Sequence, residues 1–326
     1  MLQYSEKKGI GGNGFAFIRF GAWKYPTAVV RRVFPSGYLQ DMHFHDFPQV
    51  WYCQDGFYRH QIGHNVYDCG KGSLVVVPAG VFHGFKIPED QEADIFCIET
   101  MYSLFMSTPQ DRYVNAAANL LLPCFSKELG YTFPECYYLG PDSQLLAGDY
   151  LSELSLLDYR SSGTAMDIVY DRLEDFFSLP EVAVPEKYQR KAIRLIQHKA
   201  RPILRAIDYI NNNYSQKIVA EDLLRVATLC HTDFYKYFRR FLRLTFSTYH
   251  QQLRIARVRL LIGNTTYSFT KIAELCGFSD AAHMSKCYKK ETGTLMRNTR
   301  AATRRAKSAQ QQPRGIEHRL RYMDTL

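Results

Sequence analysis

The chain has 326 residues, about two domains of ordinary size. Its 46% hydrophobic and 22% charged residues are typical of a globular protein and exclude a fibrous or largely disordered chain. The net charge of +9 is unevenly divided, with 13 basic and 22 acidic residues up to Pro185 and 28 basic and 10 acidic residues after it. The basic part favours a polyanionic partner, with nucleic acid the first candidate and an anionic membrane surface the second.

The start of the chain lacks an apolar secretory segment, and no stretch approaches the ~18 apolar residues of a membrane span. These features predict a cytoplasmic protein. The eight cysteines form no C-x-x-C pair, so we expect buried thiols rather than disulfides or a zinc site.

Short runs of aromatic and β-branched residues, separated by turn residues, fill the chain between about residues 14 and 98. This spacing predicts strands near 15–20, 28–34, 49–53, 57–60, 73–77 and 94–98. Strands this short and this regularly spaced indicate an antiparallel sandwich or barrel within residues 1–140.

Three histidines follow a two-part pattern in this region. His43 and His45 alternate along a strand, Gln49 comes four residues later, and a P-x-G-x-x-H motif ends at His83. The two parts resemble the cupin motifs, which implies a barrel interior where His43, His45 and His83 converge. In metal cupins a Glu joins the histidines around a divalent ion, but here Gln49 occupies that position, and a neutral amide is a poorer ligand for a hard cation.

Two interpretations of this region therefore stay open. One is a small-molecule site lined by His43, His45, Gln49, Trp51, Tyr58 and His83, although each aromatic residue could equally be plain core. The other is a metal site formed by His43, His45, Gln49 and His83.

Apolar residues recur at helical spacing between residues 141 and 179. We expect two amphipathic helices there, which either dimerise the protein or pack on their own barrel. Two prolines within seven residues, Pro180 and Pro185, then predict a linker over 180–200.

The pattern of residues 218–240 predicts a helix-turn-helix unit. Phe234, Phe238 and Phe241 share one face of its second helix, and polar and basic side chains share the other. The pattern returns over 268–290, where Gly277 suits a turn with positive φ and Ser279 can cap the following helix. A helix over 247–262 is expected to join the two units.

The region from about Ile203 to Arg300 resembles the tandem helix-turn-helix domain of the AraC/XylS family of transcription regulators. The resemblance is carried by residues 207–214, Asp222, Leu223, Phe234, Phe238, Arg239, Tyr249, Arg254, Leu260, Leu261, Ile272, Ala273, Gly277, Phe278, Ser279, Lys286, Tyr288, Lys289, Gly293 and Arg300. Cys230, Arg243 and Met296 depart from it, and a Cys at the first cap predicts a weaker start for that helix.

The resemblance implies a DNA-binding domain over 201–300, a small-molecule effector, a homodimer and RNA polymerase as a partner. The expected DNA-binding residues are His231, Thr232, Tyr235, Lys236, Arg239, Arg240, Ser279, Asp280, Ala281, His283, Lys286, Lys289 and Lys290. Residues 301–326, rich in Arg, Lys and Gln, are expected to form a basic mobile tail.

Together these features predict an α+β multidomain protein: an antiparallel cupin-like barrel with following amphipathic helices, then an all-α domain with two helix-turn-helix units joined by a helix. The leading hypothesis is a ligand-responsive, sequence-specific transcription regulator without catalytic residues or a required cofactor. The alternatives are a metal-dependent cupin enzyme or metal sensor fused to a DNA-binding domain, and a constitutive DNA-binding protein with a vestigial barrel.

Overall fold

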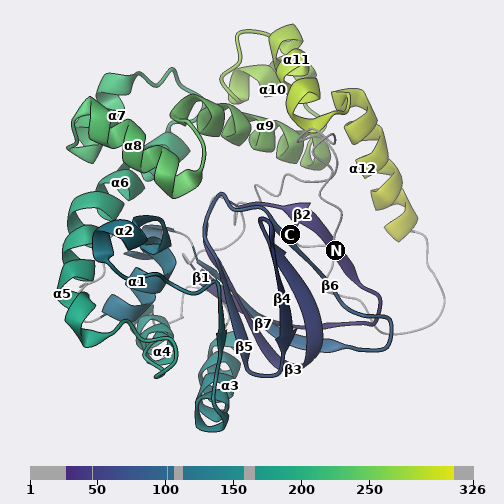
Figure 1. The fold of residues 1–326 in the computed structure, drawn as a ribbon. Coiled ribbons are helices and arrows are strands. Elements are labelled where there is room, and N and C mark those ends of the chain that lie inside the picture. Colours follow the sequence, from purple (N-terminus) through teal and green to yellow (C-terminus); the bar gives the residue numbers. More distant parts are fainter. Residues whose placement is uncertain (1–26, 46, 101, 106–112, 158–165, 312–326) are drawn as a thin grey trace. The chain divides into compact units, whose positions relative to one another are not determined.

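The computed structural model describes residues 27–45, 47–100, 102–105, 113–157 and 166–311 (Figure 1). The strand expected at 15–20 lies outside them. The described residues form two compact units, one holding 27–209 and 220–246 and the other 210–219 and 247–311. Each unit is described by itself.

Eight strands of the first unit pair antiparallel throughout the described residues, which confirms the expected antiparallel β-rich module. They are β1 (Thr27–Phe34), β2 (Leu39–His43), β3 (Gln49–Ile62), β4 (Asn65–Gly70), β5 (Ser73–Val77), β6 (His83–Lys86), β7 (Ala93–Thr100) and β8 (Cys136–Tyr138).

The long strand β3 belongs to both layers of the β-sheet. Its first half pairs with β5 and β7, and its second half, from Phe57, pairs with β4 and β6. The prediction of two strands, 49–53 and 57–60, is therefore wrong. The ladder shifts register between Cys53 and Asp55, and Gly56 adopts a φ of 81°, so the polar residues expected to form a turn instead form a bulge that bends one strand.

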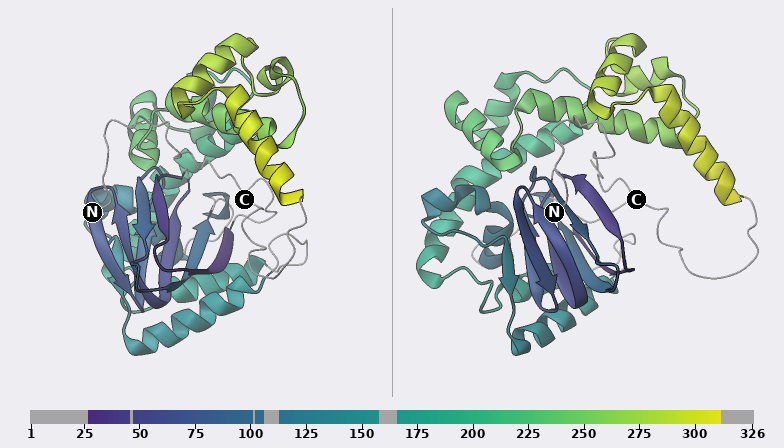
Figure 2. Two further views of the ribbon diagram at one scale, coloured as in Figure 1. Left: turned by 90° about the vertical axis from the view of Figure 1, so that its right-hand side faces the viewer. Right: turned by 45° about the vertical axis from the view of Figure 1, so that its right-hand side comes forward.

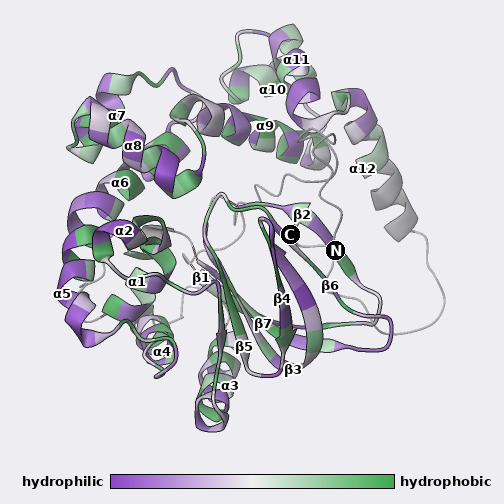
Figure 3. Cartoon of the chain, viewed as in Figure 1, coloured by the Kyte–Doolittle hydropathy of each residue, from purple (hydrophilic) through white to green (hydrophobic). Residues whose placement is uncertain are grey.

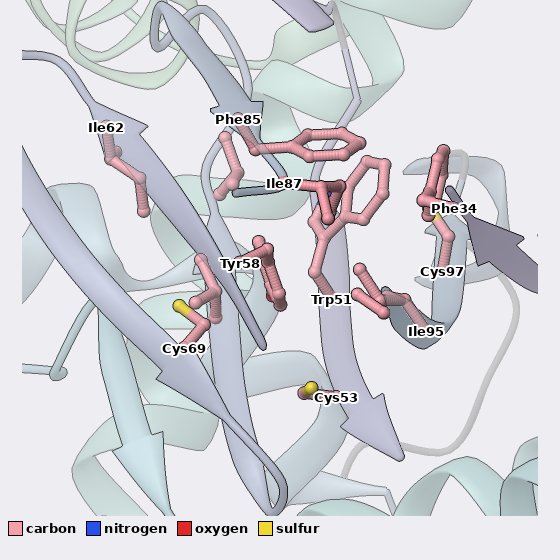
Figure 4. Close-up of a cluster of buried hydrophobic side chains, with 13 residues drawn as sticks. Phe34, Trp51, Cys53, Tyr58, Ile62, Cys69, Phe85, Ile87, Ile95 and Cys97 are labelled. Carbon is pink, nitrogen blue, oxygen red and sulfur yellow. The ribbon is translucent and has the colours of Figure 1, made fainter. Parts of the chain in front are cut away.

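The side chains between the two layers form an aromatic core. Trp51 lies 5.0 Å from Phe85 between ring centroids, and Phe34 lies 5.0 Å from the same Phe85 ring. Figure 4 shows these three rings gathered together with Ile87 and Ile95 around them. Strand β5 is buried along its length and hydrophobic from Leu74 to Val77 (Figure 3), as expected of a strand covered on both faces.

Helices complete the first unit. They are α1 (Val114–Leu121), α2 (Ser126–Leu129), α3 (Pro141–Ser155), α4 (Met166–Phe177), α5 (Glu186–Leu195), α6 (Arg201–Asn212), whose last turn falls in the second unit, α7 (Ala220–Ala227) and α8 (His231–Leu242), with the short turns η1 (Tyr102–Phe105) and η2 (Pro123–Phe125). The expected linker over 180–200 is helical from Glu186, because α5 continues through a π-helical turn, Ile196–Ala200, into α6. No helix in the described ranges is both long and apolar enough to cross a membrane.

The two helices expected between 141 and 179 are present as α3 and α4. The Tyr52 hydroxyl donates to the backbone oxygen of Gln144 at 3.2 Å, and its ring lies 6.2 Å from that of Phe176. Figure 2 shows α3 lying beside the strands. One side of each helix is therefore core, whereas Leu145 of α3 and Leu156, the residue that caps its C-terminus, are 72% and 86% exposed.

The second unit contains α9 (Phe246–Asn264), α10 (Phe269–Leu275), α11 (Ala281–Thr292) and α12 (Met296–Gln311). Its core includes Met284 and Tyr288, which lie four residues apart in α11. Arg254 of α9 donates to the backbone oxygens of Tyr214 at 2.7 Å and Gln216 at 2.8 Å. The tail expected from residue 301 is helical as far as Gln311, where alanines and arginines favour a helix, and residues 312–326 lie outside the described part of the chain.

The ends of the two second helices differ. Cys230 makes no side-chain capping bond at the start of α8, as expected from its departure from the family pattern, and Arg243 ends that helix with a left-handed φ of 59°. At α11 the expectation for Ser279 is wrong. Asp280 is the cap, accepting from the His283 backbone N–H at 2.7 Å, and Ser279 donates to that Asp280 carboxylate.

The turn at Gly277 generates a prediction. Gly277 has a φ of 74°, and a Cβ there would clash with the backbone oxygen of Ser215, so Gly277→Ala should destabilise the second unit by more than about 1 kcal/mol. Urea unfolding followed by circular dichroism measures the change. The matched control is Gly263→Ala inside α9, where a Cβ meets only ordinary contacts and should stabilise the helix by about 0.5–1 kcal/mol. A Gly277→Ala protein as stable as wild type would contradict the left-handed turn.

Candidate ligand site and nucleic-acid interface

Strand register places the histidines of the β-sheet together. His43 of β2 stands opposite His83 of β6, and His83 stands opposite Ile62 of β3. His60 lies two residues from Ile62 on the same face, because side chains of a strand alternate. His45 follows directly after β2.

The imidazoles form one buried cluster. The ring centroids of His43 and His83 are 4.3 Å apart, those of His43 and His45 are 4.8 Å apart, and those of His45 and His83 are 5.4 Å apart. All three residues are buried, and one ligand atom from each lies within 4.8 Å of the others. The structure thus brings together the three histidines that the sequence motifs singled out.

His60 is a fourth member of this cluster. Its Nε2 lies 3.1 Å from Nδ1 of His83, and both rings are fully buried. The Nδ1 of His60 and the Nε2 of His83 have no hydrogen-bond partner among the described residues. His60 thus occupies one face of the His83 ring and leaves the Nε2 of His83 available to a ligand.

Burial favours the neutral form of three of these imidazoles, those of His43, His60 and His83. Desolvation lowers the pKa of His60 to about 3 and holds the pKa of His83 well below its ordinary value. Desolvation also lowers the pKa of His43, against the opposing effect of the Asp41 backbone oxygen, which lies 2.7 Å from the His43 Nδ1. Because a carbonyl only accepts, that Nδ1 carries the proton, so the His43 Nε2 has a free lone pair.

Gln49 lies beside a buried acid. Its Nε2 donates to Oε1 of Glu99 at 3.5 Å, and its Oε1 accepts from the Trp51 indole N–H at 3.4 Å. Burial raises the pKa of the Glu99 carboxyl, an effect that the charge of Arg32 opposes. Trp51 links this pair to the histidines, with its ring 5.8 Å from that of His60 and 6.5 Å from that of His83.

The predicted residues His43, His45, Gln49, Trp51 and His83 therefore lie in one cluster, which we call the polar cluster and which also contains His60 and Glu99. The predicted Tyr58 lies at its border, with its ring 5.8 Å from those of His60 and Phe85. His60 and Glu99 were not among the predicted residues. Alternation with Tyr58 could have indicated His60, but Glu99 became evident only through its pairing opposite Gln49.

Helix α8 presents a polar and basic face. His231, Thr232, Lys236 and Arg239 are exposed, and Tyr235 is half-buried with its ring 4.6 Å from that of His231. The opposite face is core, because Phe234, Phe238 and Phe241 are buried as predicted. This division leaves the first turns of α8 open to a partner.

Arg240 is placed differently from the other predicted DNA contacts of α8. Its two terminal nitrogens pair with both carboxylate oxygens of Glu128 in α2, and one of them also donates to the Cys124 backbone oxygen at 2.8 Å. The hydrogen bonds from Arg240 lower the pKa of Glu128 to about 2. Arg240 is therefore engaged inside the first unit.

Helix α11 carries the second predicted set. Ser279, Asp280, His283, Lys286, Lys289 and Lys290 are exposed, and Ala281 is half-buried. Asp280 is occupied as the helix cap, and its bond from the His283 backbone N–H lowers the pKa of its carboxyl. The three lysines leave the exposed side of this helix basic.

Two family profiles match the chain. Residues 34–128 match an AraC-like ligand binding domain, and residues 223–302 match a helix-turn-helix domain. The first stretch contains the histidine cluster, and the second contains α8 and α11.

Curated relatives and solved structures agree with these matches. The transcriptional activator RhaS of Yersinia pseudotuberculosis is 23% identical over 292 residues, which cover 86% of this chain and 96% of RhaS. The regulator GbdR of Pseudomonas aeruginosa is 25% identical over 129 residues, so the chain matches only 35% of the length of GbdR. ToxT of Vibrio cholerae shares the fold, with a TM-score of 0.50 and 10% identity over 84% of this chain and 98% of ToxT.

An N-terminal ligand-binding domain followed by a helix-turn-helix domain is the organisation of a transcription regulator that responds to a ligand. The chain belongs to the AraC family of transcription regulators, as the resemblance of its C-terminal region had indicated.

Proposed function

We propose that this regulator senses a small molecule at the polar cluster of the β-sheet and binds duplex DNA through α8 and α11. The observation that carries the proposal is that one chain combines a buried cluster of imidazoles with helices that have exposed basic faces. A solved ToxT structure holds (E)-4-(8-methylnaphthalen-1-yl)but-3-enoic acid, which supports a small organic ligand for a protein of this fold. RNA polymerase is the proposed protein partner, and no catalytic step is required.

The charge distribution supports the DNA-binding half of the proposal. The exposed lysines and arginines of α8 and α11 lie on helices whose opposite faces are core, so their charges face outward. Contacts of this kind with phosphates release counterions and make the affinity fall with salt. The side chains at the start of each helix are the proposed base contacts.

Lys236 tests this assignment. The Lys236→Ala protein should bind a mixed-sequence duplex more weakly. The negative slope of log affinity against log salt should become shallower by about 1, because one phosphate contact is lost. Fluorescence anisotropy at several salt concentrations measures both. Lys71→Ala, which removes an exposed lysine from the turn between β4 and β5, is the control and should change neither. An unchanged slope in Lys236→Ala would remove Lys236 from the interface.

We further propose that α3 dimerises the protein through its exposed apolar side. Leu145 and Leu156 are eleven residues apart, close to three helical turns, and therefore share a face. Ile168 of the neighbouring α4 is also 44% exposed. A second copy of the chain is the proposed occupant, because a two-fold regulator matches paired DNA half-sites.

Charge on this face should dissociate the dimer. We expect the Leu145→Glu Leu156→Glu protein to sediment as a monomer at concentrations where wild type is a dimer, because the two carboxylates would be buried unpaired at the interface. Sedimentation velocity gives the answer. Val66→Glu, at a 44% exposed position of β4, is the control and should remain dimeric. A dimer that survives both charges would place the interface elsewhere.

A metal ion is a second candidate ligand for the cluster. The observation that favours it is the convergence of His43, His45 and His83. Burial favours the neutral imidazole at His43 and His83, which is the form that binds transition metals. The fixed proton on the His43 Nδ1 directs its Nε2 lone pair outward from the Asp41 carbonyl. Three imidazoles would leave an open coordination position, which an effector could occupy. Gln49, the fourth predicted ligand, hydrogen-bonds to Trp51 and Glu99.

Metal removal and titration decide this candidate. Protein treated with a chelator should bind Zn²⁺ in an equimolar amount by calorimetry, and His83→Ala should weaken that binding more than about tenfold, because it removes one of three ligands. His64→Ala, at an exposed turn position outside the cluster, should bind as wild type does. Equal binding by wild type and His83→Ala, or none by wild type, would exclude the metal site.

A further inference from the structure

The C-terminal half of helix α8 is held against the N-terminal part of the same unit. Arg240 makes its paired hydrogen bonds with Glu128 and lies over the Phe125 ring, with its guanidinium carbon 5.2 Å from the ring centroid. The ring of Tyr237, one turn earlier, meets Phe125 edge-on at 5.7 Å. Lys199 adds a second positive charge, 3.9 Å from Glu128. We call these contacts the α2 clamp.

The α2 clamp pairs the positive charge of Arg240, which DNA phosphates would also attract, with the carboxylate of Glu128. A guanidinium that forms a two-bond pair with a carboxylate has its paired donors occupied, so it cannot make the same pair with a phosphate. Glu128 also places a negative charge beside the basic face of α8, which repels a polyanion. Lys236 and Arg239 of the same helix remain exposed. The clamp therefore pairs one positive charge of α8 with a carboxylate and leaves exposed side chains in its first turns.

A second contact joins the end of α8 to the histidine cluster. Gly80, in the turn between β5 and β6, lies so close to the Leu242 backbone oxygen that a Cβ at Gly80 would clash with it. The Gly80 N–H donates to the backbone oxygen of His45 at 2.7 Å. His83 begins strand β6 three residues later. One short turn, whose Gly80 is three residues before His83, therefore contacts the end of α8 and hydrogen-bonds to His45.

We propose that the Glu128–Arg240 pair of the α2 clamp, which we call the latch, inhibits DNA binding by the first recognition helix, α8. Ligand binding at the histidine cluster releases the latch through the turn that contains Gly80. This inference rests on the proposed DNA-binding function and adds its regulation. With the latch closed, Arg240 is neutralised by Glu128. With the latch open, Arg240 joins Lys236 and Arg239 on the DNA-binding face. Ligand binding releases the latch only by favouring the open arrangement over the closed one.

Two variants open the latch without removing a positive charge from α8. Glu128→Gln removes the partner carboxylate, and Arg240→Lys keeps the charge but loses the two-bond geometry. We expect each to bind a fluorescein-labelled, mixed-sequence duplex about fivefold or more tightly than wild type at low salt. The full chain is used, and the affinity is measured by anisotropy. A direct DNA contact by Arg240 in the wild-type arrangement would give the opposite result for Arg240→Lys, an unchanged or weaker affinity.

The control separates the latch from a general change in charge. Glu153→Gln breaks a salt bridge of similar type, to Arg172, on α3 and changes the net charge equally. An equal affinity gain in Glu128→Gln and Glu153→Gln, or no gain in Glu128→Gln, would overturn the latch while leaving DNA binding intact. No binding by wild type or by either latch variant would instead reject the proposed function itself.

Discussion

Strand β3 organises the first unit, because it pairs with β4, β5, β6 and β7 along its fourteen residues. Its first half places Gln49 opposite Glu99, and its second half places Ile62 opposite His83. Since side chains alternate along a strand, a one-residue slip in this register would turn His60, Trp51 and Gln49 to the other face. The bulge beside Gly56 allows one strand to carry both sets of residues into the same interior.

The features predictable from sequence are those encoded by local periodicity. The aromatic spacing of Phe234, Phe238 and Phe241 identifies the core face of α8, and Gly277 identifies the left-handed turn between α10 and α11. Residues that depend on pairing between distant segments were missed, such as Glu99. The prediction of two strands within β3 was wrong for a related reason. A glycine between polar residues is compatible with both a turn and a bulge, and pairing with the neighbouring strands decides which of the two forms.

The sequence was least informative about which charged side chains are exposed and which are paired inside the protein. Arg240 and Lys236 are equally basic and share a helix, yet Arg240 meets Glu128 from a segment 112 residues earlier, whereas Lys236 is exposed. Asp280 was predicted to face DNA, and the structure uses its carboxylate as a helix cap. Periodicity assigns a side chain to a face, but tertiary contacts decide whether its charge is available to a partner.

The left-handed conformation of Arg243 has a consequence for the balance between stability and charge. A residue with a Cβ in this conformation costs about 1 kcal/mol relative to glycine. The chain accepts that strain at the end of α8 and gains an exposed guanidinium there. The end of the recognition helix thus carries an exposed positive charge on a backbone conformation that glycine would adopt with less strain.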